Sequence, residues 1–296
     1  MKHAIIIIAD KDLPLLTKTI SYFDERFLIY IAIDKKSKIE IEDLINQPGV
    51  VSVRKKYYVN WGGWNMVQYS IDFIIEILTN PEIKFAHLIS GSDYPLKNID
   101  HLFDFFEENK SKNFISYQKL PVPWSEWGGN GGLDRLRYFY FMDTLNVRKK
   151  YGRYLNSGII SIQKKLKIKR KLDVDKLPFC IGSQWWSLPT STLRDIISFL
   201  EKNPWVYSVF KKTYVPDEMF FQTLIHKTRT KDQIDSENFR YFDWNIRDDQ
   251  NTRPAILNES DWEKVKQTNA FFGRKFDSKK SKKLLDKIDT EILRKF

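Results

Sequence analysis

The chain has 296 residues, a length that fits one large α/β domain. Its 42% hydrophobic and 29% charged residues exclude a wholly disordered chain and a collagen-like fibre, and its single cysteine excludes a disulfide scaffold. The net charge of +11 points to an anionic partner, for which nucleic acid, phosphorylated metabolites and acidic membranes are the candidates. Only four scattered histidines are present, which argues against a multi-histidine metal site.

The first half of the chain alternates between strand and helix patterns. Strands are predicted at about 3–9, 27–33, 50–54, 85–89 and 114–117, and helices at about 13–23, 41–47, 64–78 and 99–108. This alternation predicts a mainly parallel sheet with helices on both faces, whose ligands lie beyond the carboxyl ends of the strands. Asp10, Asp34 and Asp93 all follow such strands.

The second half is less regular. Residues 121–160 are rich in Gly, Trp, Tyr and Arg and are expected to form a long ordered loop region over the site. A basic run follows at 161–171, and helices are predicted near 190–201 and after Val215. We expect a single domain at 1–277 and a basic amphipathic helix at 278–296.

The opening apolar run, residues 4–9, is too short for a signal peptide or a membrane span. We therefore expect a cytoplasmic protein whose basic segments can contact the inner face of an anionic membrane. Two alternatives remain open: the 161–171 run is a solvated face, and the 278–296 tail docks on the domain.

Several motifs of other enzyme classes are absent. There is no GxxxxGK[ST] phosphate loop, GxSxG elbow or zinc-binding spacing, and no nucleic-acid-binding module is present. The two Asp-x-Asp triplets, at 10–12 and 173–175, lack the context of a metal motif, and we expect both to be structural or solvated. Neither a metal nor another cofactor is expected.

Eight segments in chain order carry a family resemblance: 3–23, 28–37, Trp61-Gly62-Gly63, 87–96, 182–186, 216–221, 239–245 and 271–277. Together they resemble the core-2/I-branching β-1,6-N-acetylglucosaminyltransferases and the related peptide O-xylosyltransferases, glycosyltransferase family 14. The Trp61-Gly62-Gly63 motif is similar to the xylosyltransferase branch in particular. The resemblance covers nearly the whole chain and implies a GT-A-like nucleotide-sugar-binding fold, in a bacterial-type member that lacks the anchors and disulfides of animal relatives.

The resemblance also implies an inverting, metal-independent transfer. Such a transfer needs one carboxylate to take the proton of the acceptor hydroxyl, and the family's base matches Glu218. The alternative is an ordinary first-turn glutamate that interacts with the helix dipole. Lys275 and Arg253 match the basic residues that contact the diphosphate, with Arg247 and Arg274 as nearby alternatives.

The remaining candidates each have a structural alternative. Asp34 is expected at the uridine or ribose, unless it only closes a strand-end turn. Asp93 binds the sugar or caps the turn before Pro95. The aromatic candidates for the sugar or acceptor are Trp185, Trp186 and Trp61, which alternatively pack in the core.

The predicted function is transfer of a sugar from a UDP-sugar to a glycan or lipid-linked glycan acceptor with a β-linkage, in surface-polysaccharide synthesis. N-acetylglucosamine is the first choice of sugar and xylose the second, and no nucleic-acid partner is expected. The alternative is a non-catalytic protein that binds an anionic ligand or nucleic acid on a degenerate transferase fold.

Overall fold

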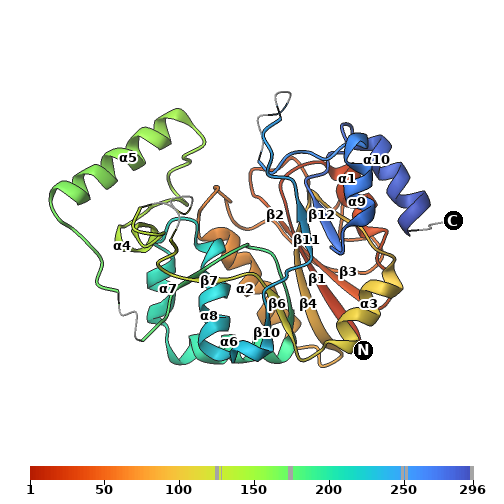
Figure 1. The fold of residues 1–296 in the computed structure, drawn as a ribbon, viewed down its shortest axis with the longest axis horizontal. Coiled ribbons are helices and arrows are strands. Elements are labelled where there is room, and N and C mark those ends of the chain that lie inside the picture. Colours follow the sequence, from red (N-terminus) through yellow and green to blue (C-terminus); the bar gives the residue numbers. More distant parts are fainter. Residues whose placement is uncertain (124–126, 128, 173–175, 248–249, 251–252, 294–296) are drawn as a thin grey trace.

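The computed structural model describes residues 1–123, 127, 129–172, 176–247, 250 and 253–293. A seven-stranded sheet forms its centre, in the order β10-β6-β9-β4-β1-β2-β3 (Figure 1). These strands are β1 (Lys2–Ala9), β2 (Phe27–Ile33), β3 (Val50–Arg54), β4 (Ile83–Ser90), β6 (Asn113–Ile115), β9 (Trp186–Pro189) and β10 (Ile234–Asp235). Only β9 is antiparallel to its neighbours in this sheet, so the predicted mainly parallel arrangement is confirmed.

Two layers of helices cover the two faces of the sheet. Successive residues of β1 point to opposite faces, so they contact the two layers alternately. Ala4, Ile6 and Ile8 pack with α2 (Asn65–Ile77), α6 (Thr190–Lys202), α7 (Trp205–Phe210) and α8 (Phe220–Thr228). Ile5, Ile7 and Ala9 pack with α1 (Leu13–Ile20), α3 (Ile99–Glu108), α9 (Trp262–Gln267) and α10 (Lys282–Lys287). Burial on both faces explains the unbroken apolar run of this strand.

Smaller elements surround the central sheet. A three-stranded sheet has the order β11-β12-β5, and a two-stranded sheet pairs β7 with β8. Their bounds are β5 (Asp93–Pro95), β7 (Gln118–Lys119), β8 (Cys180–Ile181), β11 (Arg240–Phe242) and β12 (Phe272–Arg274). Two further helices are α4 (Asp134–Arg137) and α5 (Lys150–Lys165); Figure 1 shows α5 standing apart from the body of the molecule.

Two local predictions were wrong. Residues 41–47 form turns instead of a helix. Residues 150–160, which were expected to belong to a loop region, form a helix together with the start of the basic run, the sixteen-residue α5. Its sequence contains Gly152, Gly158 and the weak helix formers Asn156, Ser157 and Ser161, which is why the pattern did not predict it.

The C-terminal tail docks on the domain. Leu284, Leu285, Ile288 and Leu293 are buried in the core that also contains α1 and α3. The carboxylate of Asp289 accepts a hydrogen bond from a core tyrosine hydroxyl at 2.6 Å. The apolar face of the predicted amphipathic helix is therefore used inside the protein. None of the helices in the described ranges is long and apolar enough to cross a bilayer.

Candidate active site

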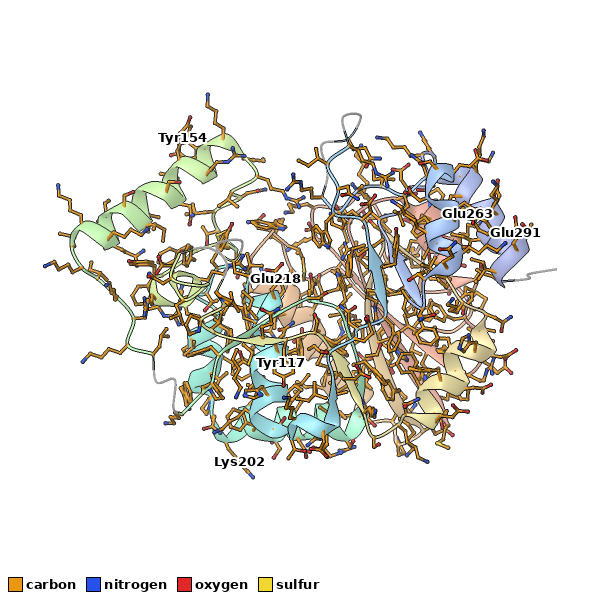
Figure 2. The ribbon with its side chains drawn as sticks, in the orientation of Figure 1. Tyr117, Tyr154, Lys202, Glu218, Glu263 and Glu291 are labelled. Carbon is orange, nitrogen blue, oxygen red and sulfur yellow. The ribbon has the colours of Figure 1, made fainter. Side chains whose placement is uncertain are left out.

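Glu218 lies in a tight 3-10 turn, Pro216–Glu218, which leads into α8 at the carboxyl side of the sheet (Figure 2). The turn begins at Val215, whose φ of 55° places a β-branched residue in the left-handed region. The Val215 N–H donates to the Gly62 carbonyl at 3.1 Å, and the Gly182 N–H donates to the Glu218 carbonyl at 2.8 Å. The motifs around Gly62 and Gly182 therefore hold the turn from two sides.

The Glu218 side chain pairs with Arg135. The Arg135 guanidinium donates to Glu218 Oε2 at 2.8 Å, while the Glu218 side chain keeps 31% of its surface exposed. Arg135 is itself fixed between the rings of Trp127 and Tyr214, at 5.3 and 5.5 Å. Burial raises the pKa of Glu218, and the positive charge of Arg135 opposes that rise. The result is an accessible carboxylate with a fixed orientation, as a general base requires.

Asp217, the neighbouring acid, lies in a different environment. It is buried, and its Oδ1 has no hydrogen-bond partner within the described part of the chain. Burial, followed by the charge of Glu218, raises the pKa of Asp217 to about 7. Of the two adjacent carboxyls, only Glu218 is placed to meet a substrate.

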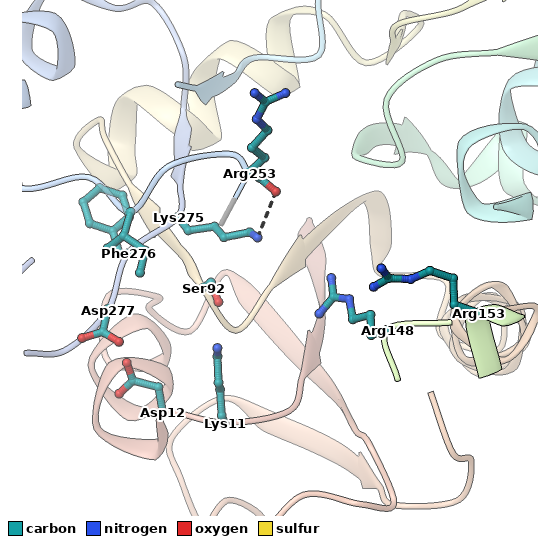
Figure 3. A pocket seen from close by; sticks show the side chains of 10 residues that line it. Lys11, Asp12, Ser92, Arg148, Arg153, Arg253, Lys275, Phe276 and Asp277 are labelled. Atoms are coloured by element: carbon teal, nitrogen blue, oxygen red, sulfur yellow. Dashed lines mark hydrogen bonds between the residues drawn. The ribbon is translucent and has the colours of Figure 1, made fainter. Parts of the chain in front are cut away.

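A cavity of about 380 Å³ lies beyond the ends of β1 and β4 (Figure 3). Its lining residues are Lys11, Asp12, Ser92, Arg148, Arg153, Arg253, Ile256, Lys275, Phe276 and Asp277. Figure 3 shows the cationic ends of Lys11, Lys275 and Arg148 directed toward a common space. The side chain of Arg253 points away from that space, while its carbonyl accepts from Lys275 Nζ at 3.3 Å.

The electrostatics of this cavity favour an anion. Both lining acids are engaged by backbone amides: Asp12 accepts from Ser278 N at 2.8 Å, and Asp277 accepts from two N–H groups that follow it. Burial, and then the nearby charges led by Arg274 and Arg148, lowers the pKa of Lys275 to about 8. Such mutual repulsion between cations is relieved when a diphosphate binds among them.

Ring contacts connect the cavity to Glu218. The Arg148 guanidinium lies 6.0 Å from the centre of the Trp61 ring, and Trp61 meets Tyr214 edge to face at 5.8 Å. Tyr214 in turn contacts Arg135, which binds Glu218. A series of side-chain contacts therefore joins the cationic cavity to the candidate base, and it includes Trp61, which is 42% exposed.

Three of the other predicted residues have structural partners. The buried Asp93 accepts from the Ser90 N–H at 2.9 Å and lies 3.3 Å from Arg274, so it closes the turn after β4. Arg274 lies over the ring of Trp185 at 4.3 Å. Asp34 Oδ1 accepts two backbone N–H groups at 3.0 and 3.1 Å, which leaves Oδ2 for the lysine two residues further on or for a ligand.

Two further site candidates are engaged within the protein. Trp186 is fully buried in the core, packed 5.1 Å from the Phe221 ring, so it presents no platform to an acceptor. Arg247 is paired with the carboxylates of Asp243 and Asp261, so its charge is neutralised within the protein. Trp185 is also buried, with 6% of its surface exposed.

The sequence analysis missed four cationic contributors to this site: Lys11, Arg135, Arg148 and Arg153. The last three lie within the Arg-rich 121–160 region that was expected over the site. Composition therefore indicated the region but could not identify the individual residues. Asp10 is exposed and Asp12 caps α1. The triplet 173–175 lies outside the described residues. No group of three His, Cys, Asp or Glu side chains suited to a metal occurs in the described ranges.

Comparison with known proteins identifies a family and several distant relatives. The family model of the Core-2/I-Branching enzymes matches residues 4–267. Xylosyltransferase 2 of Canis lupus familiaris is 25% identical over 292 residues, and that of Rattus norvegicus is 25% identical over 293 residues. Xylosyltransferase oxt of Drosophila melanogaster is 23% identical over 270 residues.

These alignments cover 91%, 92% and 84% of this chain, but 31%, 31% and 28% of the three relatives. The chain thus spans less than a third of the length of the curated relatives it matches. The family match nevertheless extends over most of the chain, and the α/β architecture is consistent with a GT-A-like fold. The chain belongs to the Core-2/I-Branching enzyme family.

Proposed function

We propose that the chain transfers a sugar from a UDP-sugar to a hydroxyl of a glycan acceptor, with inversion and without a metal. The observation that carries this proposal is the continuous contact path from the cationic cavity to Glu218. A nucleotide-sugar transferase needs both parts, a holder for the diphosphate and a base at the acceptor, within one substrate length of each other.

The chemical step follows from these groups. The acceptor oxygen forms a bond to the anomeric carbon as its proton passes to Glu218 Oε. The bond from that carbon to the diphosphate oxygen breaks on the opposite face, and UDP leaves with the electron pair. Lys11, Lys275 and Arg148 stabilise the negative charge that develops on the diphosphate. Fixed cations thereby supply the role that a divalent metal has in other transferases.

Two considerations bear on the identity of the donor sugar. The relatives are named xylosyltransferases, and the Trp61-Gly62-Gly63 motif agrees with UDP-xylose. UDP-N-acetylglucosamine remains the first choice of donor, because it is broadly available in cells. Asp34 Oδ2 is proposed to meet the uridine or ribose, and the exposed Trp61 ring is proposed to stack on a sugar.

The test is UDP release from four donors in the presence of EDTA: UDP-N-acetylglucosamine, UDP-xylose, UDP-galactose and UDP-glucose. The proposal expects release from one of them that is unchanged by EDTA. Release that is lost on chelation and restored by a divalent metal contradicts the metal-independent step. Absence of UDP binding, measured by calorimetry, contradicts the assignment of the cavity.

A further inference from the structure

The positive charge of the chain is concentrated in one segment, which we call the basic arm, residues 144–172. It contains ten Lys and Arg residues and no Asp or Glu. The chain has 49 basic and 38 acidic residues, so 39 basic residues remain against 38 acidic ones outside the arm. Nearly all of the net charge of +11 thus belongs to the arm.

The helix of this arm, α5, also exposes an apolar stripe. Tyr151 is 75% exposed, Tyr154 66% and Ile162 58%, and Leu155 and Leu166 are exposed as well. These residues recur at intervals of three, four, seven or more and follow one face of the helix, which is about 24 Å long. Figure 2 shows Tyr154 at the outer margin of the molecule.

The contacts that attach α5 to the body leave this stripe free. Gln163 exchanges hydrogen bonds with the backbone of Phe139 at 2.8 and 3.0 Å, and Ile160 packs on a small cluster of tyrosines. The buried residues of α5 in the described chain are Gly152 and Gln163, and both lie on a different face from Tyr154 and Ile162. A Cβ at Gly158, within the stripe, would meet no atom within 4 Å.

We propose that the basic arm is an interfacial membrane anchor that binds anionic lipid, with the apolar stripe among the acyl chains and the lysines at the headgroups. A water-exposed row of tyrosine and aliphatic side chains beside many lysines is the pattern of a helix that lies in the bilayer interface. The phosphate backbone of a nucleic acid would bind the lysines and arginines of the arm, but it would not account for the exposed aliphatic side chains. The tail, whose apolar residues are buried, is excluded from this role.

The arm also contributes to the active site. Arg148 and Arg153 belong to it and line the cavity near Lys275. Anchoring of the arm therefore brings two lining residues of the cavity close to the membrane surface, where a lipid-linked acceptor is presented. The membrane interaction itself does not depend on the proposed transfer reaction, because it needs no donor and no base.

The test is co-sedimentation of the full chain with phosphatidylcholine vesicles that either contain or lack phosphatidylglycerol, without any UDP-sugar. We expect binding only with the anionic lipid, and binding that weakens as salt is added. Reversing three exposed lysines, in the variant Lys165→Glu/Lys167→Glu/Lys169→Glu, is expected to lower partitioning on the order of a hundredfold. The pair Leu155→Asn/Ile162→Asn, which keeps every charge, is expected to lower it as well.

The matched control reverses three exposed lysines of the tail, Lys279, Lys280 and Lys282, to Glu and is expected to retain vesicle binding. Circular dichroism confirms that each variant is folded. Equal loss in the tail variant, or no binding of the parent chain to anionic vesicles, overturns the proposal. So does binding to duplex DNA in place of vesicles, or a dimer that the Leu155→Asn/Ile162→Asn change dissociates.

Discussion

The guanidinium of Arg135 holds the carboxylate of Glu218 at 2.8 Å, across 83 residues of sequence. The guanidinium also contacts the rings of Trp127 and Tyr214, so the orientation of the carboxylate is determined before any substrate binds. Arg135 also opposes the effect of burial on the pKa of Glu218. It is a positioning residue whose positive charge opposes the rise in the pKa of the proposed base.

Replacing Arg135 is expected to move the acid limb of the pH profile. Glu218 accepts a proton only when it is ionised, and its pKa rises once Arg135 no longer opposes burial. For Arg135→Ala we expect the acid limb of kcat/KM for UDP release to shift to higher pH. Arg135→Lys keeps the charge and is expected to shift it less. Equal profiles for the parent chain and Arg135→Ala would mean that the ion pair has no catalytic role.

Asp217→Asn is expected to stabilise the protein at high pH. Because the pKa of Asp217 is raised from 3.8 to about 7 in the folded state, the folded protein binds more protons than the unfolded chain between these values. Stability therefore falls as pH rises through this window, and the neutral asparagine removes the loss, on the order of 4 kcal/mol.

Urea unfolding at pH 5 and pH 8 measures this effect. The advantage of Asp217→Asn over the parent chain should be larger at pH 8. An advantage that is larger at pH 5 would show that Asp217 is ionised in the folded protein.

Removing cations from the cavity is expected to weaken UDP binding. Lys275→Ala and Arg148→Ala each delete a charged donor to the diphosphate, which corresponds to about a ten- to hundredfold loss of affinity. Uridine, which lacks the diphosphate, should bind all variants equally, and the exposed tail variant Lys279→Ala serves as the control. Since the pKa of Lys275 is about 8, UDP affinity should fall above that pH in the parent chain but not in Lys275→Ala. Calorimetry that finds the same UDP affinity in all four proteins would refute the assignment of the cavity.

Gly62→Ala is expected to disturb the Glu218 turn. Gly62 has a φ of +73°, and a Cβ there would lie 3.1 Å from Val215 Cγ2. Gly49 has a nearly identical φ of +75°, but its Cβ would contact β2 instead. Both alanine variants should lose about 1–2 kcal/mol of stability from the left-handed backbone.

Only Gly62→Ala should also lower kcat, because Val215 begins the turn that carries Glu218. Thermal unfolding and initial rates on the two variants separate these effects. A similar fall in kcat in Gly49→Ala would show that the loss is a general consequence of destabilisation.

The sequence could predict the parts of this molecule that are encoded locally. The helix at Ile99–Glu108 was predicted with its bounds, because Asn98 caps it and its apolar spacing is regular. Asp34 directly follows β2, and Asp93 begins β5 shortly after β4 ends. Both therefore lie at the carboxyl edge of the sheet, as the strand patterns alone implied. Burial on both faces made these strands easy to recognise.

Features that depend on distant partners could not be predicted in this way. The pairing of Arg135 with Glu218 and the neutralisation of Arg247 by Asp261 arise only when the chain folds. Trp185 and Trp186 were candidates for contact with the sugar or acceptor, but Arg274 covers the first ring and the core encloses the second.

The most direct test of the account is a comparison of the parent chain with Glu218→Gln, in which UDP affinity and UDP release from the preferred donor are both measured in EDTA. Glutamine keeps the shape of the side chain but cannot accept the proton of an attacking hydroxyl. The account predicts unchanged UDP affinity and a loss of turnover of about a hundredfold or more. Turnover that persists in Glu218→Gln at the parent rate would contradict it.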